Sequence, residues 1–215
     1  MSPKIALLCG CVLLVAGCSG NRDGIPRIVD TPQTGTTTGT TWQALPVPPV
    51  QRRDPGLNVP WQWVPPKDIE RRWTAIVIHH SASDNGNAEI FDEYHRESKH
   101  WQGVGYDFVI GNGTDSGDGQ VEVTFRWRQQ LTGAHCKTPG NWANEEAVGI
   151  CLVGNFDNDR PTARQMQSLL KLVRFLQRRY NIPALQIYGH KDTPGAGVTD
   201  CPGRYFPMAR FKSML

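Results

Sequence analysis

The chain has 215 residues, with 23 Lys and Arg against 20 Asp and Glu, which gives a formal net charge of +3. This length suits one ordinary domain with extensions, and the core of such a domain is large enough to fold unaided. So small a positive charge excludes the basic footprint of a nucleic-acid-binding protein, and no nucleic-acid partner is expected.

The first 17 residues have the pattern of a secretory signal peptide. Lys4 precedes an apolar run over residues 5–16, which is too short to span a bilayer. The run ends in Leu-Val-Ala-Gly-Cys at residues 14–18, which resembles the lipobox of bacterial lipoproteins. This resemblance implies cleavage before Cys18, lipidation of its thiol and a membrane anchor, with Ser19 favouring the outer membrane, facing the periplasm. An ordinary signal peptide with an incidental Cys18 is the alternative.

Residues 18–66 are poor in large aliphatic side chains and rich in Thr, Gly, Pro and Gln. Such a composition cannot bury enough apolar surface to offset its conformational entropy, so it predicts a solvated tether. Trp61 and Trp63, near its end, are expected to pack on the edge of the domain. The folded domain is therefore predicted over residues 67–215.

Strand-like and helix-like patterns alternate from Trp73 onward. Thr162 starts the strongest helix, because Gln165 completes a capping box and apolar residues follow at helical spacing. An earlier helix is expected to bury Ile90, Phe91 and Tyr94. Strands are predicted over residues 75–80, 106–111, 120–125, 147–153 and 186–190, and further helices over 87–98 and 207–214. Together they predict a single α/β domain in which a central mixed β-sheet is flanked by helices.

Three cysteines remain beyond Cys18, and they differ in setting. Cys201 lies in a polar turn eleven residues after His190, which ends a predicted strand. Together with one histidine from positions 79 and 80, Cys201 and His190 would form the three-ligand set of a hydrolytic zinc site. Cys151 lies inside an apolar strand and is interpreted as a small buried hydrophobe. A disulfide between Cys136 and Cys151 is the alternative, without geometric support from the sequence.

Short motifs in one order carry a family resemblance that runs from about Trp73 to the C-terminus. They are Ile-Val-Ile-His-His-Ser-Ala at 76–82, Gly-Tyr-Asp-Phe-Val-Ile at 105–110, Gly-Ala-His at 133–135, Val-Gly-Ile at 148–150 with Gly-Asn-Phe at 154–156, Gly-His at 189–190 and Cys-Pro-Gly at 201–203. Together they resemble the type-2 N-acetylmuramoyl-L-alanine amidase family, which includes amidase-type phage lysozymes and animal peptidoglycan recognition proteins.

The resemblance implies one Zn²⁺ per chain. Its ligands fall on His79, His190 and Cys201, while strand alternation directs His80 to the opposite face of the sheet. One bacterial subset of the family uses Asp as the third ligand with a Glu on the central strand. Here the ligand position is Cys201 and the strand has Cys151, which places the chain with the phage and animal type.

Further roles follow from the same resemblance. Tyr106 matches the Tyr that helps to polarise the scissile carbonyl, and Thr199 occupies a position where relatives carry Lys or Thr. His135 matches a His at the cleft and is expected to contact substrate, and either His135 or Tyr106 to pass the proton to the leaving amine. Arg126 is assigned to the acidic peptide stem, with a solvated strand-end position as the alternative for residues 126–128.

The predicted function is zinc-dependent hydrolysis of the amide between N-acetylmuramic acid and L-alanine in peptidoglycan or muropeptides, by a monomer. A lipoprotein that binds or senses peptidoglycan without turnover is the alternative from another class. A structural zinc domain would need a fourth protein ligand, and the sequence offers none near Cys201.

Overall fold

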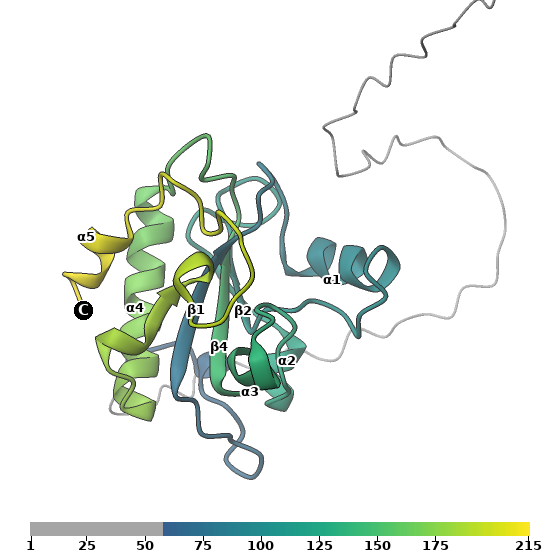
Figure 1. Cartoon of the computed structure of the whole chain (residues 1–215), viewed down its shortest axis with the longest axis vertical. Helices are drawn as coiled ribbons and strands as arrows, with labels where there is room; N and C mark the ends of the chain where they lie inside the picture. The colour runs from purple at the N-terminus through teal and green to yellow at the C-terminus, as the bar shows by residue number, and fades with distance from the viewer. Residues whose placement is uncertain (1–57) are drawn as a thin grey trace, which may run out of the picture. The chain divides into compact units, whose positions relative to one another are not determined.

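The computed structural model describes residues 58–215 (Figure 1). The predicted signal peptide over 1–17, the lipidation site Cys18 and the tether up to residue 57 lie outside the described residues. No helix within residues 58–215 is both long enough and apolar enough to cross a membrane.

Five strands form one mixed sheet, as predicted. They are β1 (Ala75–His80), β2 (Phe108–Ile110), β3 (Val121–Val123), β4 (Ala147–Leu152) and β5 (Ile187–Gly189). Their order is β3-β2-β4-β1-β5, in which β3 runs antiparallel to β2 and the other neighbours are parallel. Both β1 and β4 are buried along their whole length, which explains their nearly continuous apolar sequence.

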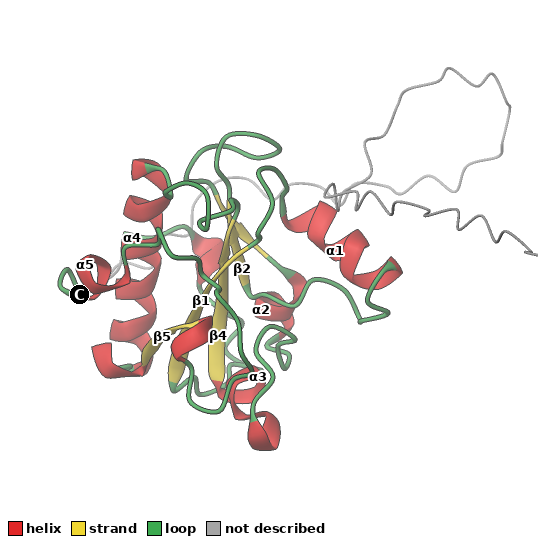
Figure 2. Cartoon of the chain, turned by 45° about the horizontal axis from the view of Figure 1, so that its top comes forward, coloured by secondary structure: helices red, strands yellow, loops and turns green. Residues whose placement is uncertain are grey.

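Helices cover both faces of this sheet (Figure 2). They are α1 (Ala88–Glu97), α2 (Phe125–Gln129), α3 (Trp142–Glu146), α4 (Ala163–Tyr180) and α5 (Met208–Lys212). In Figures 1 and 2, α4 and α5 lie on one side of the sheet and α1 and α3 on the other. The predicted single α/β domain with a mixed sheet between helices is therefore confirmed.

The main apolar core lies between the sheet and α4. Thr162 and Gln165 form the predicted capping box at the start of α4. The buried residues of α4 pack against the side chains of β1, β2 and β4 that point to this face; the set includes Leu169, Leu172, Val173, Phe175, Leu176, Ile76, Ile78, Phe108, Ile110, Val148, Ile150 and Leu152. Long apolar side chains from two layers thus form one continuous core.

The folded domain begins before residue 67, contrary to the predicted boundary. Val59 and Trp63 are buried within the main core. The carbonyl oxygen of Trp63 accepts a hydrogen bond from Trp127 Nε1 at 3.0 Å. The centroid of the Trp63 ring lies 6.0 Å from that of the Phe175 ring. Trp61 is half-exposed at the edge. The domain therefore includes Val59 and Trp63, which fill core positions.

Two local predictions are wrong. Residues 125–129 form α2, capped by the Thr124 side chain, and do not continue the preceding strand. In α1 the buried side chains are Phe91 and His95, whereas Tyr94 is 39% exposed. His95 Nδ1 accepts the backbone N–H of Gly105 at 3.1 Å, so this histidine replaces Tyr94 on the inner face.

Candidate metal centre

Adjacent histidines at the end of β1 point to opposite faces of the sheet. His79 lies on the α1 side and is 1% exposed. His80 lies on the α4 side, where its Nδ1 accepts the backbone N–H of Phe156 at 3.0 Å and its ring packs on that phenyl group. Strand alternation thus separates a ring that faces the site from a ring that supports the core.

His190 and Cys201 reach the same end of the sheet through β5, which runs parallel to β1. His190 follows directly after Gly189, the last residue of β5. The carbonyl oxygen of Cys201 accepts the backbone N–H of Lys191 at 2.8 Å, and the hydroxyl of Thr199 accepts the Cys201 N–H at 3.2 Å. Thr199 therefore shapes the turn that holds Cys201.

The three side chains converge on one point. Cys201 Sγ lies 3.6 Å from His79 Nδ1, the rings of His79 and His190 are 4.6 Å apart, and the candidate ligand atoms lie within 4.8 Å of one another. Zinc bonds of about 2.0–2.1 Å to nitrogen and about 2.3 Å to sulfur at a tetrahedral angle require an N···S separation of about 3.6 Å. Both the donor types and this distance fit Zn²⁺.

Burial keeps both histidine ligands neutral and the cysteine protonated. Burial lowers the pKa of His79 well below its usual value, with further lowering by His135 and His190, and it also lowers the pKa of His190. Neutral imidazole is the form that binds metals. Burial raises the pKa of the Cys201 thiol to about 12, opposed by the backbone N–H of His80. A bound cation acts in the opposite direction and favours the thiolate.

His135 lies behind His79. Its Nδ1 is 3.1 Å from His79 Nε2 and its Nε2 is 3.3 Å from the carbonyl oxygen of Ala147. Its ring is 8% exposed, and burial lowers its pKa to about 3. The prediction that His135 contacts substrate or passes a proton to it does not fit this position, because protein groups occupy both ring nitrogens.

Tyr106 lies beside the three ligands. Its ring centroid is 5.2 Å from that of His79. Burial raises the pKa of its hydroxyl well above the usual value, and the neighbouring Cys151 and Cys201 raise it further. The hydroxyl therefore keeps its proton and can donate a hydrogen bond.

Arg126 is buried within the fold. It is 3% exposed in α2, and its guanidinium donates to the carbonyl oxygens of Val104 and Thr132. A solvated strand-end position is therefore wrong for Arg126. The assignment of its charge to a peptide stem does not fit either, since these backbone acceptors hold it inside the domain.

Cys136, Cys151 and Cys201 are all free within the described part of the chain. The alternative of a Cys136–Cys151 disulfide is therefore wrong, and Cys151 is fully buried as expected for a small hydrophobe. It lies opposite His79 in the β1–β4 register, so it forms part of the floor next to the cluster.

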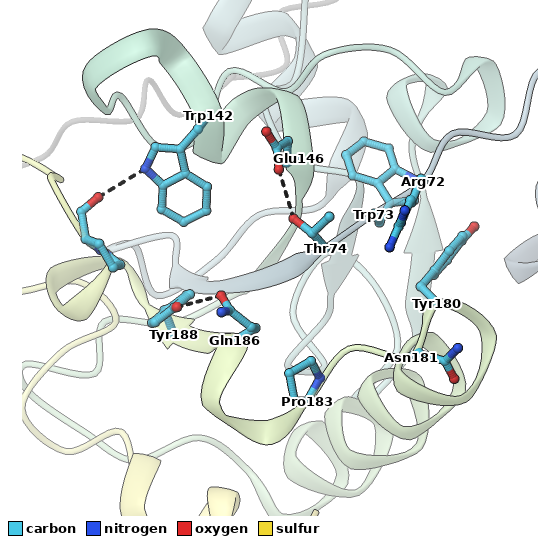
Figure 3. Close-up of a pocket in the computed structure, with 11 residues that line it drawn as sticks. Arg72, Trp73, Thr74, Trp142, Glu146, Tyr180, Asn181, Pro183, Gln186 and Tyr188 are labelled. Atoms are coloured by element: carbon cyan, nitrogen blue, oxygen red, sulfur yellow. Dashed lines mark hydrogen bonds between the residues drawn. The ribbon is translucent and has the colours of Figure 1, made fainter.

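A surface hollow of about 540 Å³ lies at the other end of the sheet (Figure 3). Its lining includes Thr74, Glu146 and Gln186, which come just before β1, β4 and β5. The rings of Trp142 and Tyr188 border it, and the Trp142 Nε1 group already donates to the carbonyl oxygen of Pro194. Parallel sheets place their reaction sites at the carboxyl ends of strands. The ligand cluster lies at that end, so the hollow is at the end opposite to the expected reaction site.

The sequence analysis did not predict the roles of two positions that shape the site, Gly149 and Asn144. A Cβ atom on Gly149 would lie 2.4 Å from Cδ2 of His135, so only glycine leaves room for this ring. The Asn144 side chain accepts the backbone N–H groups of His135 and Cys136 at 2.8 and 2.9 Å. A lone glycine within an apolar strand was the available signal for the first position, since it indicates close approach. The sequence carried no local signal for the second.

One family's sequence profile, described as N-acetylmuramoyl-L-alanine amidase, matches residues 69–204. The chain belongs to this amidase family. Its folded domain is therefore a member of a group whose relatives carry the names of both amidases and peptidoglycan recognition proteins.

Individual relatives of this amidase-family chain come from animals and bacteria. Peptidoglycan-recognition protein SC2 of Drosophila simulans is 30% identical over 136 residues, which span 59% of this chain and 66% of that protein, just under two thirds. The structure of N-acetylmuramoyl-L-alanine amidase LysC from Clostridium intestinale is 34% identical, with a TM-score of 0.56 over 66% of this chain and 84% of that one. Bumblebee PGRP-SA matches at 25% identity and a TM-score of 0.54, over 68% of this chain and 84% of that one.

Proposed function

We propose that this chain is a zinc-dependent N-acetylmuramoyl-L-alanine amidase that hydrolyses the bond between N-acetylmuramic acid and L-alanine in peptidoglycan. The observation that carries the proposal is the convergence of His79, His190 and Cys201, with Cys201 Sγ 3.6 Å from His79 Nδ1. Three protein ligands leave one position of a tetrahedral zinc site open, which is the arrangement of catalytic sites.

His79, His190 and Cys201 would hold the zinc ion, which would supply Lewis-acid activation of water and of the amide carbonyl. The chain's own residues supply the remaining functions. The Tyr106 hydroxyl, which burial keeps protonated, donates toward the oxygen on which negative charge develops. Such a donor contributes about 2.7–4 kcal/mol when it is well placed. Thr199 holds the Cys201 turn through the Cys201 N–H.

Recognition of peptidoglycan without turnover is the second candidate function. It is favoured by the similarity to animal recognition proteins, among them SC2 of Drosophila simulans. The ligand cluster favours hydrolysis, since binding alone does not require two histidines and a buried cysteine to meet at one point. The similarity to the amidase LysC, at 34% identity, supports the same choice.

Release of peptides from purified peptidoglycan by the full-length chain in detergent tests the proposal. Zinc-dependent release of peptides with a free L-alanine N-terminus, identified by mass, is expected from wild type and lost in His190→Ala and Cys201→Ala. His100→Asn, at an exposed histidine with positive φ that Asn tolerates, serves as the control and keeps activity. Tight binding of peptidoglycan by wild type with no released peptide would establish recognition and exclude the amidase.

The chain is further proposed to be a monomer, lipid-anchored at Cys18 to the outer membrane and facing the periplasm. The lipobox-like residues 14–18 and Ser19 support this address. Fractionation of cells that produce wild type or Cys18→Ser tests it: wild type is expected with outer membranes, and the variant is expected to be lost from that fraction. Light scattering of the Cys18→Ser chain is expected to give the mass of one chain.

A further inference from the structure

His135 forms one link in a series of contacts that ends at the ligand cluster. The carbonyl oxygen of Ala147, the ring of His135 and the ring of His79 are joined by contacts of 3.3 and 3.1 Å. The last ring nitrogen, Nδ1 of His79, then lies 3.6 Å from Cys201 Sγ. Each neutral imidazole has one N–H and one lone pair, so the position of a single proton determines the direction of the whole series.

The Ala147 carbonyl determines that direction. A carbonyl oxygen only accepts hydrogen bonds, so the proton of His135 belongs on Nε2. Its Nδ1 is then an acceptor, and His79 Nε2 must be the donor across the 3.1 Å contact. The lone pair of His79 therefore lies on Nδ1, the atom that faces Cys201. The opposite direction would leave a His135 lone pair facing the carbonyl oxygen.

We propose that His135 is a positioning residue that fixes the tautomer and ring orientation of His79 for zinc binding. The N–H that a metal-binding histidine does not use for the metal is commonly held by an acceptor, and this acceptor sets which nitrogen binds. Here that acceptor is a second histidine, itself held by a backbone carbonyl. The inference rests on the proposed zinc site and adds to it a role for a residue that does not touch the metal.

The surroundings of His135 hold its ring in place. Its backbone N–H and that of Cys136 both donate to the Asn144 side chain, and Gly133 N–H donates to the Asn144 carbonyl at 2.7 Å. The ring lies directly over Gly149, at a distance that leaves no room for a Cβ. A side chain confined in this way loses little freedom when it accepts the hydrogen bond from His79 Nε2, which suits a positioning role.

Zinc affinity, measured by competition with a chromogenic chelator, tests the proposal without reference to turnover. His135→Ala in the full-length chain is expected to raise the zinc Kd by about 10–100-fold, the usual effect of losing such a partner. His135→Asn is the matched variant, because its Oδ1 takes the place of Nδ1 as an acceptor. It is expected to restore the Kd to within about threefold of wild type.

Two controls separate this role from others. Unfolding of the metal-free proteins shows whether His135→Ala acts through general stability. If His135→Ala and His135→Asn lose similar stability but only His135→Ala binds zinc weakly, the result supports positioning. Nitrogen chemical shifts of zinc-bound wild type are expected to show a proton on Nε2 of both His79 and His135. Equal zinc affinity of wild type and His135→Ala, or a proton on Nδ1 of His135, would overturn the inference and leave the amidase proposal intact. Failure of wild type to bind zinc would overturn both.

Discussion

The two faces of the central sheet carry different kinds of residue. Toward α4, β1 and β4 present side chains such as Ile76, Ile78 and Ile150, which pack against apolar residues of the helix. Toward α1, the same strands present His79 and Gly149, with the His135 ring over the glycine. The main apolar core thus lies on one face, whereas the other face combines smaller apolar clusters with the buried His79 and His135.

The difference between the two faces of β1 and β4 means that one face mainly stabilises the fold and the other carries the candidate site. Burial of one large aliphatic side chain contributes about 1.5–3 kcal/mol, so the α4 face is expected to supply most of the stability. A buried polar group adds little when it is paired and costs about 1–3 kcal/mol when it is not. Substitutions on the α1 face should therefore change metal binding and pH dependence more than they change the fold.

The largest expected effect is the loss of the proposed hydrolysis in Cys201→Ala. Removal of one ligand from a three-ligand site abolishes productive metal binding, which is expected to reduce peptide release by about 10³-fold or more. The free energy of unfolding of the metal-free chain, measured with a chelator present, is expected to stay within about 1 kcal/mol of wild type. A variant that fails to fold without metal would contradict the separation of the two faces.

A matched pair of leucines tests the α4 face. Leu172 is fully buried in α4, whereas Leu185 is 83% exposed. Leu172→Ala is expected to lower the free energy of unfolding by about 2–5 kcal/mol, and Leu185→Ala to change it by less than about 0.5 kcal/mol. Denaturant titration measures both. Zinc affinity of the folded Leu172→Ala chain should stay within about threefold of wild type, and a larger change would show that the two faces are linked.

Asp107 gives the α1 side a predicted pH dependence. Burial raises the pKa of its carboxyl to about 7, opposed by the Gly149 N–H and by Arg126, and one of its oxygens has no partner. The folded chain therefore keeps this proton between about pH 4 and pH 7, whereas the unfolded chain, with a pKa of about 3.9, releases it. Stability consequently falls as the pH rises through this window, by up to about 1.4 kcal/mol per unit, and the contribution levels off above pH 7.

Asp107→Asn removes that proton exchange and keeps an acceptor for the Gly149 N–H. Denaturant titrations of wild type and variant from pH 4 to pH 8 are expected to diverge as the pH rises, with the variant gaining relative stability up to about pH 7. Parallel profiles of the two proteins would show that the Asp107 carboxyl ionises normally in the folded chain.

The sequence predicted the sheet because its strands have strong local patterns, whereas the choice of His79, His190 and Cys201 as ligands depended on the family resemblance. The apolar runs of β1 and β4 and the capping box of α4 predict these elements from neighbouring residues alone. His79 and His190 each stand at the end of such a strand, and parallel pairing brings strand ends together.

The errors arose where distant contacts decide the structure. Helices α2 and α3 have five residues each, too few to show helical periodicity, and they depend on caps and packing. Trp63 belongs to the domain because it meets Phe175, more than a hundred positions later. The place of His135 depends on the turn held by Asn144 and on the space over Gly149, neither of which is visible in its own motif.

Gly149→Ala is expected to have the smallest effect and to probe the α1 face most directly. The added methyl would lie 2.4 Å from Cδ2 of His135, so the ring must move away from His79. Zinc affinity is expected to fall by about tenfold, the lower end of the range for a disturbed partner of a metal-binding histidine. Gly197→Ala is the control, because nothing lies within 4 Å of its added methyl.

The double variant Gly149→Ala/His135→Ala identifies the cause. If the methyl acts only through the His135 ring, the double variant binds zinc as weakly as His135→Ala alone, because the group that it displaces is already gone. An additive loss would mean that the methyl disturbs β1 and β4 themselves, and with them the position of His79. The two faces would then not be independent at Gly149, because a substitution on the α1 side would have disturbed the strands that carry both faces.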